Sequence, residues 1–327
     1  MFAWNNKRVL VTGAGGFIGS HLAERLVEEG AQVRTFVHYN ALGRWGWLEH
    51  SPQAKHMEVM AGELTDRDSV RQAVKGREIV FHLGALIAIP YSYQAPVSYI
   101  HTNTEGTVNV LQSAREEGVE RVVHTSTSEV YGTAQYAPID EKHPLKGQSP
   151  YSASKIGADK MAEAFHLSFD LPVVTVRPFN TFGPRQSTRA IIPTIIVQCL
   201  LGEKIHLGNL HPTRDLNYVS NTVDGFLLAA STPSAVGQTI NLGSGREISV
   251  GDLANLIAQL IGKPIKIESE DQRLRPQGSE VERLLADHTL AKSLLSWQPR
   301  VSLEDGLVRT IAWIKDNLEF FRSTYVY

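Results

Sequence analysis

The chain has few of the features that mark secreted, membrane-embedded or nucleic-acid-binding proteins. Its one cysteine, Cys199, cannot form an internal disulfide, and we expect a core thiol in the reducing cytoplasm. No run of about 18 uncharged apolar residues occurs, so we expect no membrane span. The start, MFAWNNKRVLVTG, lacks the apolar segment of a signal peptide. A formal net charge of -2 excludes the basic excess of a non-specific nucleic-acid binder.

The chain does contain a regular alternation of apolar strands and amphipathic helices. Strand-like runs such as KRVLVTG and EIVFHLGA are separated by helical segments such as IGSHLAERLVEEG. This pattern predicts an α/β fold with a doubly wound parallel sheet covered by helices on both faces. After about residue 180 the alternation of strands and helices becomes less regular. We therefore predict a large domain in residues 1–180, to which some later segments return, and a smaller α/β lobe mainly in residues 181–327.

A glycine-rich turn follows the first predicted strand. The segment VLVTGAGGFIGSHL places Gly13, Gly16 and Gly19 directly after the strand and at the start of a helix. Glycine allows a tight turn and close approach to a pyrophosphate, and the helix N-terminus offers free amides to the anion. In this strand–turn–helix context the spacing predicts a dinucleotide site.

The end of the second strand bears on which dinucleotide binds. An NAD site usually has an acid there for the ribose hydroxyls, but this sequence reads RTFVHYN, with His38 and Tyr39 instead. His38 is either a ribose contact or a solvated side chain. Nothing in this segment would repel a 2′-phosphate, and Arg34 or Arg44 could lie near one. The sequence therefore leaves both NAD and NADP open.

The chemistry-bearing residues follow in VVHTSTSEVYG and SPYSASKIGAD. Tyr151 and Lys155 are four residues apart, so they share a helix face, and a nearby ammonium would lower the phenol pKa toward neutral pH. The strand that ends at TSTSE carries Glu129 behind four hydroxyl side chains. An acid at the end of a buried strand is costly to desolvate unless it is paired or used.

Together these segments, with Asn103 in NTEGTVNVL and the stretch RPFNTFGPR, resemble the extended short-chain dehydrogenase/reductase family, whose members act on sugar nucleotides. The resemblance runs to SWQP near the C-terminus. It implies a Rossmann domain that holds a tightly bound NAD or NADP, regenerated in each turnover, and a lobe that binds a nucleoside-diphosphate sugar. By this resemblance Tyr151 deprotonates the sugar 4-hydroxyl and Thr127 binds the same oxygen. Lys155 tunes Tyr151 and holds the nicotinamide ribose, and hydride passes from C4 to the cofactor.

The resemblance also implies a cofactor wall and a substrate set. The cofactor residues are Gly13, Gly16, Phe17, Ile18, Gly19, His38, Glu63, Leu64, Leu83, Gly84, Ala85, Asn103, Tyr151 and Lys155. The substrate residues are Asn180, Arg185, Arg214 and Arg275. Arginine suits a diphosphate because its fork donates two parallel hydrogen bonds, although each of these arginines could instead be a solvated surface charge.

Glu129 decides between the reactions of this family. A 4-epimerase usually has a small apolar residue at that position, whereas 4,6-dehydratases and nucleotide-sugar decarboxylases carry Glu. The pair Ser128–Glu129 resembles that of GDP-mannose 4,6-dehydratases. By this resemblance Glu129 removes the C5 proton and protonates the hydroxyl that leaves C6, while Ser128 helps to hold it. A simple hydrogen bond in the turn is the structural alternative for Glu129.

Our leading hypothesis is therefore a lyase, a nucleotide-sugar 4,6-dehydratase. The apolar stretch LIAIP at residues 86–90 favours a neutral hexose or an N-acetylhexosamine. With the aromatic loop HYNALGRWGWLEH, it is similar to dehydratases of legionaminic-acid and related amino-sugar pathways. A 4-epimerase is the second reading and a UDP-glucuronate decarboxylase, which shares TSTSEVYG, the third. The alternative that is not an enzyme is a regulator that binds NAD(P) without catalytic activity.

The resemblance further implies a homodimer. Helices predicted at about 103–117 and 150–168 carry apolar stripes, and in relatives the equivalent helices form a four-helix bundle across a two-fold axis. We predict no metal site, no nucleic-acid partner and no membrane partner.

Overall fold

The computed structural model describes residues 2–270 and 275–321. Its centre is a seven-stranded sheet in the order β10-β6-β5-β4-β1-β2-β3, and every neighbouring pair is parallel. The strands are β1 (Arg8–Thr12), β2 (Gln32–His38), β3 (Met57–Gly62), β4 (Ile79–His82), β5 (Arg121–Thr125), β6 (Val173–Pro178) and β10 (Thr239–Leu242). The strand order reverses between β1 and β4, and in such sheets ligands bind at the carboxyl ends beside this point.

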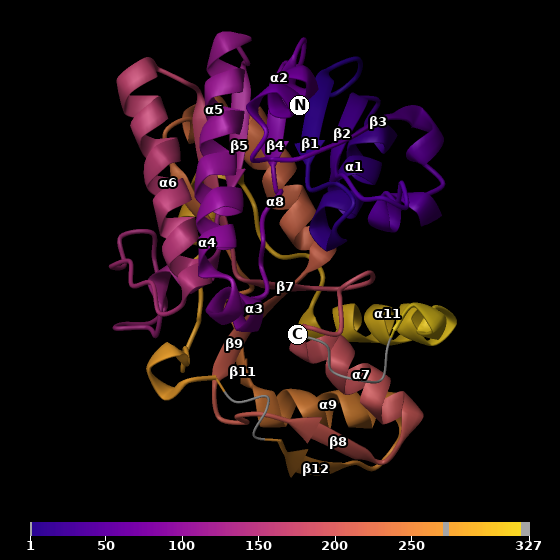
Figure 1. The fold of residues 1–327 in the computed structure, drawn as a ribbon. Coiled ribbons are helices and arrows are strands. Elements are labelled where there is room, and N and C mark those ends of the chain that lie inside the picture. Colours follow the sequence, from indigo (N-terminus) through magenta and orange to yellow (C-terminus); the bar gives the residue numbers. More distant parts are fainter. Residues whose placement is uncertain (1, 271–274, 322–327) are drawn as a thin grey trace.

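Helices cover both faces of this sheet, as the apolar strand runs predict (Figure 1). Along β1, Leu10 packs into one core cluster, whereas Val9 and Val11 pack into the other. One layer holds α2 (Arg67–Val74), α5 (Gly106–Glu116) and α6 (Pro150–Phe169), and the other holds α1 (Phe17–Glu28) and α8 (Val219–Ser231). The predicted doubly wound, Rossmann-type α/β fold is confirmed.

The segment that leads into α5 departs from the simple helix that the sequence predicts. α3 (Ile89–Gln94) and α4 (Pro96–Tyr99) come first, and then η3 (Ile100–Glu105) forms a π-helical turn that continues into α5. Such turns are rare and occur frequently at functional sites. Here the widened turn contains the buried Asn103.

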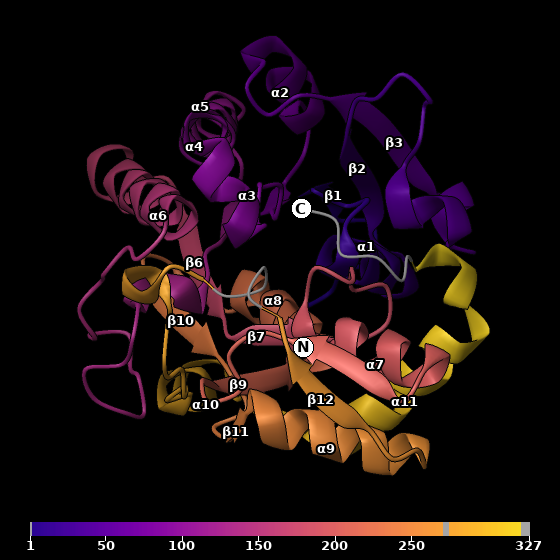
Figure 2. The same ribbon diagram turned by 60° about the horizontal axis from the view of Figure 1, so that its bottom comes forward.

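A smaller lobe lies at one end of the large sheet, below it in Figure 1. One of its sheets pairs β7 (Asn180–Phe182), β9 (Thr213–Tyr218) and β11 (Glu247–Ser249), and the other pairs β8 (Lys204–Leu207) with β12 (Lys266–Ser269). Figure 2 shows α7 (Ile191–Leu201), α9 (Val250–Ile261) and α11 (Leu303–Asp316) gathered around these strands. α10 (Thr289–Leu295) packs near β10. Within the described residues, the other short helical turns are η1 (Gly46–His50), η2 (Ala54–His56), η4 (Ser128–Tyr131), η5 (Pro233–Ala235), η7 (Gln277–Ser279) and η8 (Leu318–Phe320).

A single large core joins the lobe to the sheet. It runs from Val11 of β1 through Phe226 of α8 to Ile257 of α9 and Trp297. Cys199 of α7 lies fully buried in this core, and burial raises the pKa of its thiol to about 11, as expected for an unreactive packing residue. No helix within residues 2–270 and 275–321 is long and apolar enough to cross a bilayer.

Candidate active site at the carboxyl ends of the sheet

The glycine-rich turn packs so closely against neighbouring backbone that it has no room for side chains. Gly13 has φ +68°, and a Cβ added to it would lie 2.8 Å from the Cα of Gly84. A Cβ on Gly19 would collide with the carbonyl oxygen of Gly13. α1 begins at once, with Gly16 at its N-cap, no capping side chain and no acid in its first turn. The free amides at this helix end therefore fit the pyrophosphate of a dinucleotide.

The turn is held against the end of β4. The Thr12 hydroxyl accepts hydrogen bonds from the amides of Leu83 (3.1 Å) and Gly84 (3.0 Å). A Cβ on Gly84 would meet the Leu64 side chain at 2.8 Å. Three predicted cofactor residues, Leu64, Leu83 and Gly84, are thus brought to the glycine turn.

The predicted ribose end has no unpaired acid. His38 ends β2 and is exposed, and its Nδ1 lies 3.1 Å from Oε1 of Glu63. Arg44 pairs with Glu49 at 3.1 Å. The suggestion that Arg34 could lie near a 2′-phosphate is wrong. Its guanidinium pairs with Glu58 and donates to three backbone carbonyls at the end of α2, away from the carboxyl end of the strand.

An aromatic loop supports the glycine turn from outside, whereas the sequence leaves open whether Trp45 and Trp47 are packing residues. The backbone amide of Trp47 donates to the carbonyl of Gly15 at 3.0 Å. The Trp47 ring packs edge-on against Trp313 of α11 and Phe320, with centroids 5.4 and 5.5 Å away. The available signal was the pair of tryptophans in a loop otherwise rich in turn residues. Trp47 is therefore a packing residue, whereas Trp45 is 41% exposed at the rim.

Asn103 shapes the cofactor wall through the backbone. Its amide group accepts from the Leu86 amide (2.8 Å) and donates to the Leu86 carbonyl (2.9 Å) and to Ser154 Oγ (3.0 Å). Both amide hydrogens and the oxygen are therefore used within the protein. Asn103 positions the loop after Ala85 and offers no free donor to a cofactor.

The predicted catalytic residues meet between α6 and the end of β5. Tyr151 and Lys155 lie on the first turns of α6, which begins with a capping box between Ser149 and Ser152. Thr127 caps η4 by accepting from the amide of Glu129 (3.2 Å), and it also hydrogen-bonds Tyr151. The structure thus gathers Thr127, Tyr151 and Lys155, as expected from the sequence.

The electrostatics differ from the simple expectation for a tyrosine–lysine pair. Burial raises the pKa of Tyr151, the nearby Glu129 adds to this, and the Thr127 hydrogen bond opposes it. The Lys155 ammonium donates to the Thr125 carbonyl at 2.6 Å, and burial lowers its pKa to about 8. In the protein alone, the effect of burial on the Tyr151 pKa is therefore larger than any lowering by Lys155. The expectation that Lys155 brings this pKa toward neutral pH is corrected because both side chains are deeply buried.

Glu129 lies buried on η4 and faces charges from the lobe. Its Oε2 is 3.8 Å from Nη1 of Arg275, an atom without a hydrogen-bond partner among the described residues. Arg275 and Arg214 also approach Glu280, at 3.9 and 3.4 Å. Burial lowers the pKa of Arg214, and the Glu129 charge opposes this. Glu280 was not predicted, although it follows Arg275 closely in RPQGSE.

The other two predicted substrate residues have different surroundings. Arg185, at φ +71°, donates from both terminal nitrogens to Glu24 of α1 at 2.9 Å, so its charge is already balanced. Asn180 begins β7, and its buried Oδ1 has no hydrogen-bond partner within the described part of the chain. An orphaned acceptor of this kind fits a polar ligand.

An apolar wall stands beside Tyr151. Leu86, Ile89 and Tyr99 pack around the Tyr151 ring in one cluster, and Ile87 of the same loop is 69% exposed. The helix α3, which follows this loop, is held in place because the Tyr93 hydroxyl contacts Ser279 Oγ at 2.6 Å.

Comparison with known proteins identifies the family to which the chain belongs. The family model described as GDP-mannose 4,6 dehydratase matches residues 10–310. The chain belongs to this family, within the NAD-dependent epimerase/dehydratase group of extended short-chain dehydrogenases/reductases.

The similar proteins carry out several reactions. The chain is 34% identical over 322 residues to a UDP-glucose 4-epimerase of Mycolicibacterium smegmatis, covering 97% of this chain and 99% of that protein. It is 34% identical over 325 residues to UDP-glucuronic acid decarboxylase 1 of Xenopus tropicalis, covering 96% and 74%. The solved structure of DesIV, a dTDP-glucose 4,6-dehydratase from Streptomyces venezuelae with NAD bound, superposes with a TM-score of 0.87 at 27% identity, covering 96% and 98%. The family is thus that of NAD-dependent nucleotide-sugar enzymes.

Proposed function

We propose that the protein is a nucleotide-sugar 4,6-dehydratase acting on a nucleoside-diphosphate hexose or N-acetylhexosamine. The observation that carries this proposal is the buried Glu129 carboxyl group, which lies between the Tyr151 environment and Arg275. A buried carboxylate is costly without a partner, and Arg275 approaches it only to 3.8 Å, beyond hydrogen-bond range. Glu129 is therefore available to a substrate.

The first chemical step uses the residues on α6 and at the end of β5. NAD or NADP, when bound at the glycine turn, supplies the hydride acceptor. Tyr151 takes the proton of the sugar 4-hydroxyl, Thr127 holds the same oxygen, and Lys155 provides the positive charge that favours the tyrosinate. Oxidation at C4 makes the C5 proton acidic.

The second step uses Glu129. Its carboxylate removes the C5 proton, and the resulting carboxylic acid delivers that proton to the hydroxyl that leaves C6 as water. Hydride would then return to C6 while C5 takes up one proton, which balances the proton that Tyr151 took from the 4-hydroxyl, so the net change is the loss of one water and no external oxidant is consumed. Ser128, buried at the start of η4, helps to fix the backbone that carries Glu129.

We assign the substrate-binding residues from their positive charge and from buried polar atoms that lack a hydrogen-bond partner. Among the described residues, Arg275 Nη1 and Asn180 Oδ1 have no hydrogen-bond partner, and Arg214 lies 3.4 Å from Glu280. We assign Arg214 and Arg275 to the diphosphate, with Asn180 near them. Arg185 can join them only by releasing Glu24. The apolar wall of Leu86 and Ile89 suits an uncharged sugar substituent such as an N-acetyl group.

A 4-epimerase is the second candidate, supported by the 34% identity to the Mycolicibacterium smegmatis UDP-glucose 4-epimerase. An epimerase has no use for Glu129 as a base, so this residue separates the two candidates. A decarboxylase also carries Glu at this position, and it is separated instead by its need for a uronate substrate.

The test is the mass of the product from UDP-N-acetylglucosamine, GDP-mannose and UDP-glucose, with UDP-glucuronate as the decarboxylase substrate. Loss of one water supports the proposal, whereas an isobaric product indicates an epimerase and loss of CO2 a decarboxylase. In Glu129→Gln we expect water loss to slow by about 10²–10⁴-fold, while cofactor reduction by the sugar persists. The matched control is Glu203→Gln, an exposed acid of the lobe. Dehydration at the normal rate in Glu129→Gln would show that the assignment is wrong.

A further inference from the structure

A charged cluster lies buried directly behind the catalytic residues. Asp159 follows Lys155 by one turn of α6 and is 4% exposed. Its carboxylate accepts hydrogen bonds from Ser126 Oγ (2.7 Å) and Arg177 Nη2 (3.0 Å), and it contacts His124 Nε2 at 3.0 Å. One carboxylate thus connects α6, the end of β5 and β6.

The cluster continues to the turn that carries Glu129. Arg177 Nη1 donates to the Tyr131 hydroxyl at 2.9 Å, and this hydroxyl donates to Asn241 Oδ1 at 2.8 Å. Tyr131 is the last residue of η4, two positions after Glu129. Asp159 and Arg177 therefore link both catalytic segments, α6 and η4, to the edge of the large sheet.

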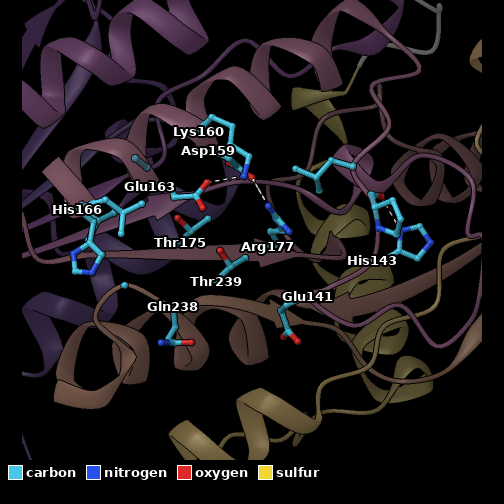
Figure 3. Close-up of a pocket in the computed structure, with 16 residues that line it drawn as sticks. Glu141, His143, Asp159, Lys160, Glu163, His166, Thr175, Arg177, Gln238 and Thr239 are labelled. Carbon is cyan, nitrogen blue, oxygen red and sulfur yellow. Dashed lines mark hydrogen bonds and ion pairs between the residues drawn. The ribbon is translucent and has the colours of Figure 1, made fainter.

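A polar cavity explains how this ion pair can stay charged. A space of about 420 Å³ runs along α6 over β6 and β10, and Asp159, Arg177, Glu141 and His143 are among the residues that line it. Figure 3 shows Asp159 and Arg177 among the residues that line this space, with a dashed line marking the ion pair between them. Burying an ion pair in an apolar core is costly, but a roomy polar cavity can hold water beside it.

The groups around Lys155 make Asp159 its balancing charge. Burial lowers the pKa of His124 and of His82 on the neighbouring strands, so both imidazoles are neutral at pH 7. Burial is also the larger effect on Lys155 and lowers its pKa, and the Asp159 carboxylate opposes it. Tyr151, on the same helix, is uncharged until it gives up its proton, and Arg177 is directed to Asp159 itself.

We propose that Asp159 is a positioning residue for hydride transfer. It ties the segment Thr125–Thr127 to α6 through Ser126, and it supplies the negative charge that keeps the Lys155 ammonium in place against Thr125. The inference rests on the proposed function only in the roles of Tyr151 and Lys155 in C4 oxidation, a step that the dehydratase, the epimerase and the decarboxylase share.

The direct test is the titration of Lys155 in the ligand-free protein. NMR of ¹³C-labelled lysine side chains, with the Lys155 signal assigned by loss in Lys155→Met, gives its pKa. In Asp159→Asn we expect that pKa to fall by about half to one pH unit, and the basic limb of the pH profile for cofactor reduction to move down equally. Asp159→Glu should restore both. Glu163→Gln, on the same helix and paired with the exposed Lys160, should change neither.

Two further variants separate charge from packing. Arg177→Met breaks the same ion pair but keeps the carboxylate, so the Lys155 pKa should not fall. Ser126→Ala removes only the link to the strand end, and the kcat for cofactor reduction should drop about tenfold at unchanged KM. This variant decides the matter if Asp159→Asn does not fold.

The inference is overturned by an unchanged Lys155 titration in folded Asp159→Asn, or by an unchanged kcat in Ser126→Ala. The product mass of the wild-type enzyme is read separately, so failure of the proposed dehydration leaves this result intact. Conversely, an unaltered Lys155 pKa refutes the role of Asp159 whatever the product is.

Discussion

Replacing Tyr151 with phenylalanine removes one oxygen atom from the centre of the site. Tyr151 is buried against Leu86, Ile89 and Tyr99, and its hydroxyl bonds Thr127. Phenylalanine keeps all of the ring packing, so the fold loses one hydrogen bond, worth about 1 kcal/mol. The reaction loses its base for the 4-hydroxyl.

The expected kinetic cost is much larger than the cost in stability. A positioned general base contributes about 10²–10⁴-fold, which is about 3–5 kcal/mol of transition-state stabilisation. Burial raises the pKa of Tyr151 in the protein alone, which makes its hydroxyl harder to deprotonate. Proton transfer from the substrate therefore depends on this oxygen being held beside Thr127 and Lys155. We therefore expect Tyr151→Phe to slow cofactor reduction at least a hundredfold while unfolding at nearly the same urea concentration.

The assay is single-turnover absorbance of the reduced nicotinamide after mixing with the nucleotide sugar. The matched control is Tyr99→Phe, because Tyr99 is also buried, its ring lies 6.2 Å from that of Tyr151, and its hydroxyl donates to the Ala88 carbonyl at 2.5 Å. Tyr99→Phe should lose similar stability and keep the rate. Cofactor reduction by Tyr151→Phe at more than a tenth of the wild-type rate would refute the role of Tyr151.

Two other predictions concern stability and assembly. Because burial lowers the Lys155 pKa from 10.5 to about 8, its charge costs about 3 kcal/mol in the folded protein below pH 8, and this cost fades as the pH rises to 10.5. Lys155→Met should therefore raise the free energy of unfolding by about 1–2 kcal/mol at pH 7 and by less at pH 10, and it should abolish cofactor reduction. Urea titrations at both pH values measure the change in stability. A lower free energy of unfolding at pH 7 than in the wild type would contradict this prediction. The exposed Leu167 lies on α6, one of the helices expected to pair between protomers, and the exposed Ile100 lies on η3, which leads into the other. Sedimentation should show a homodimer that Ile100→Lys with Leu167→Lys converts to monomer and that Val308→Lys on α11 does not, and a monomeric wild type would overturn the expectation.

The sequence predicts features that depend on neighbours along the chain. The parallel sheet follows from apolar runs such as VLV and IVF between helices, and the turn at Gly13 follows from its place between a strand and a helix. Tyr151 and Lys155 meet because four residues make about one helical turn. These features need no knowledge of distant contacts.

The features that were missed depend on residues far apart in the chain. Arg185 is balanced by Glu24, which lies 161 positions away, and nothing in RPFNTFGPR indicates that partner. The sign of the Tyr151 pKa shift depends on burial beneath the loop at residues 86–89, which a sequence does not give. The π-helical turn around Asn103 likewise depends on the bonds from that residue to Leu86 and Ser154.

The contact of Trp47 with Phe320 has a consequence for synthesis on the ribosome. The glycine turn is synthesised well before Trp313 and Phe320, two residues of the aromatic wall behind it. At elongation rates of about 5–20 residues per second, some 14–55 seconds separate the synthesis of the Trp47 and Phe320 rings. During this interval the nucleotide turn of a nascent chain lacks the support of Trp313 and Phe320.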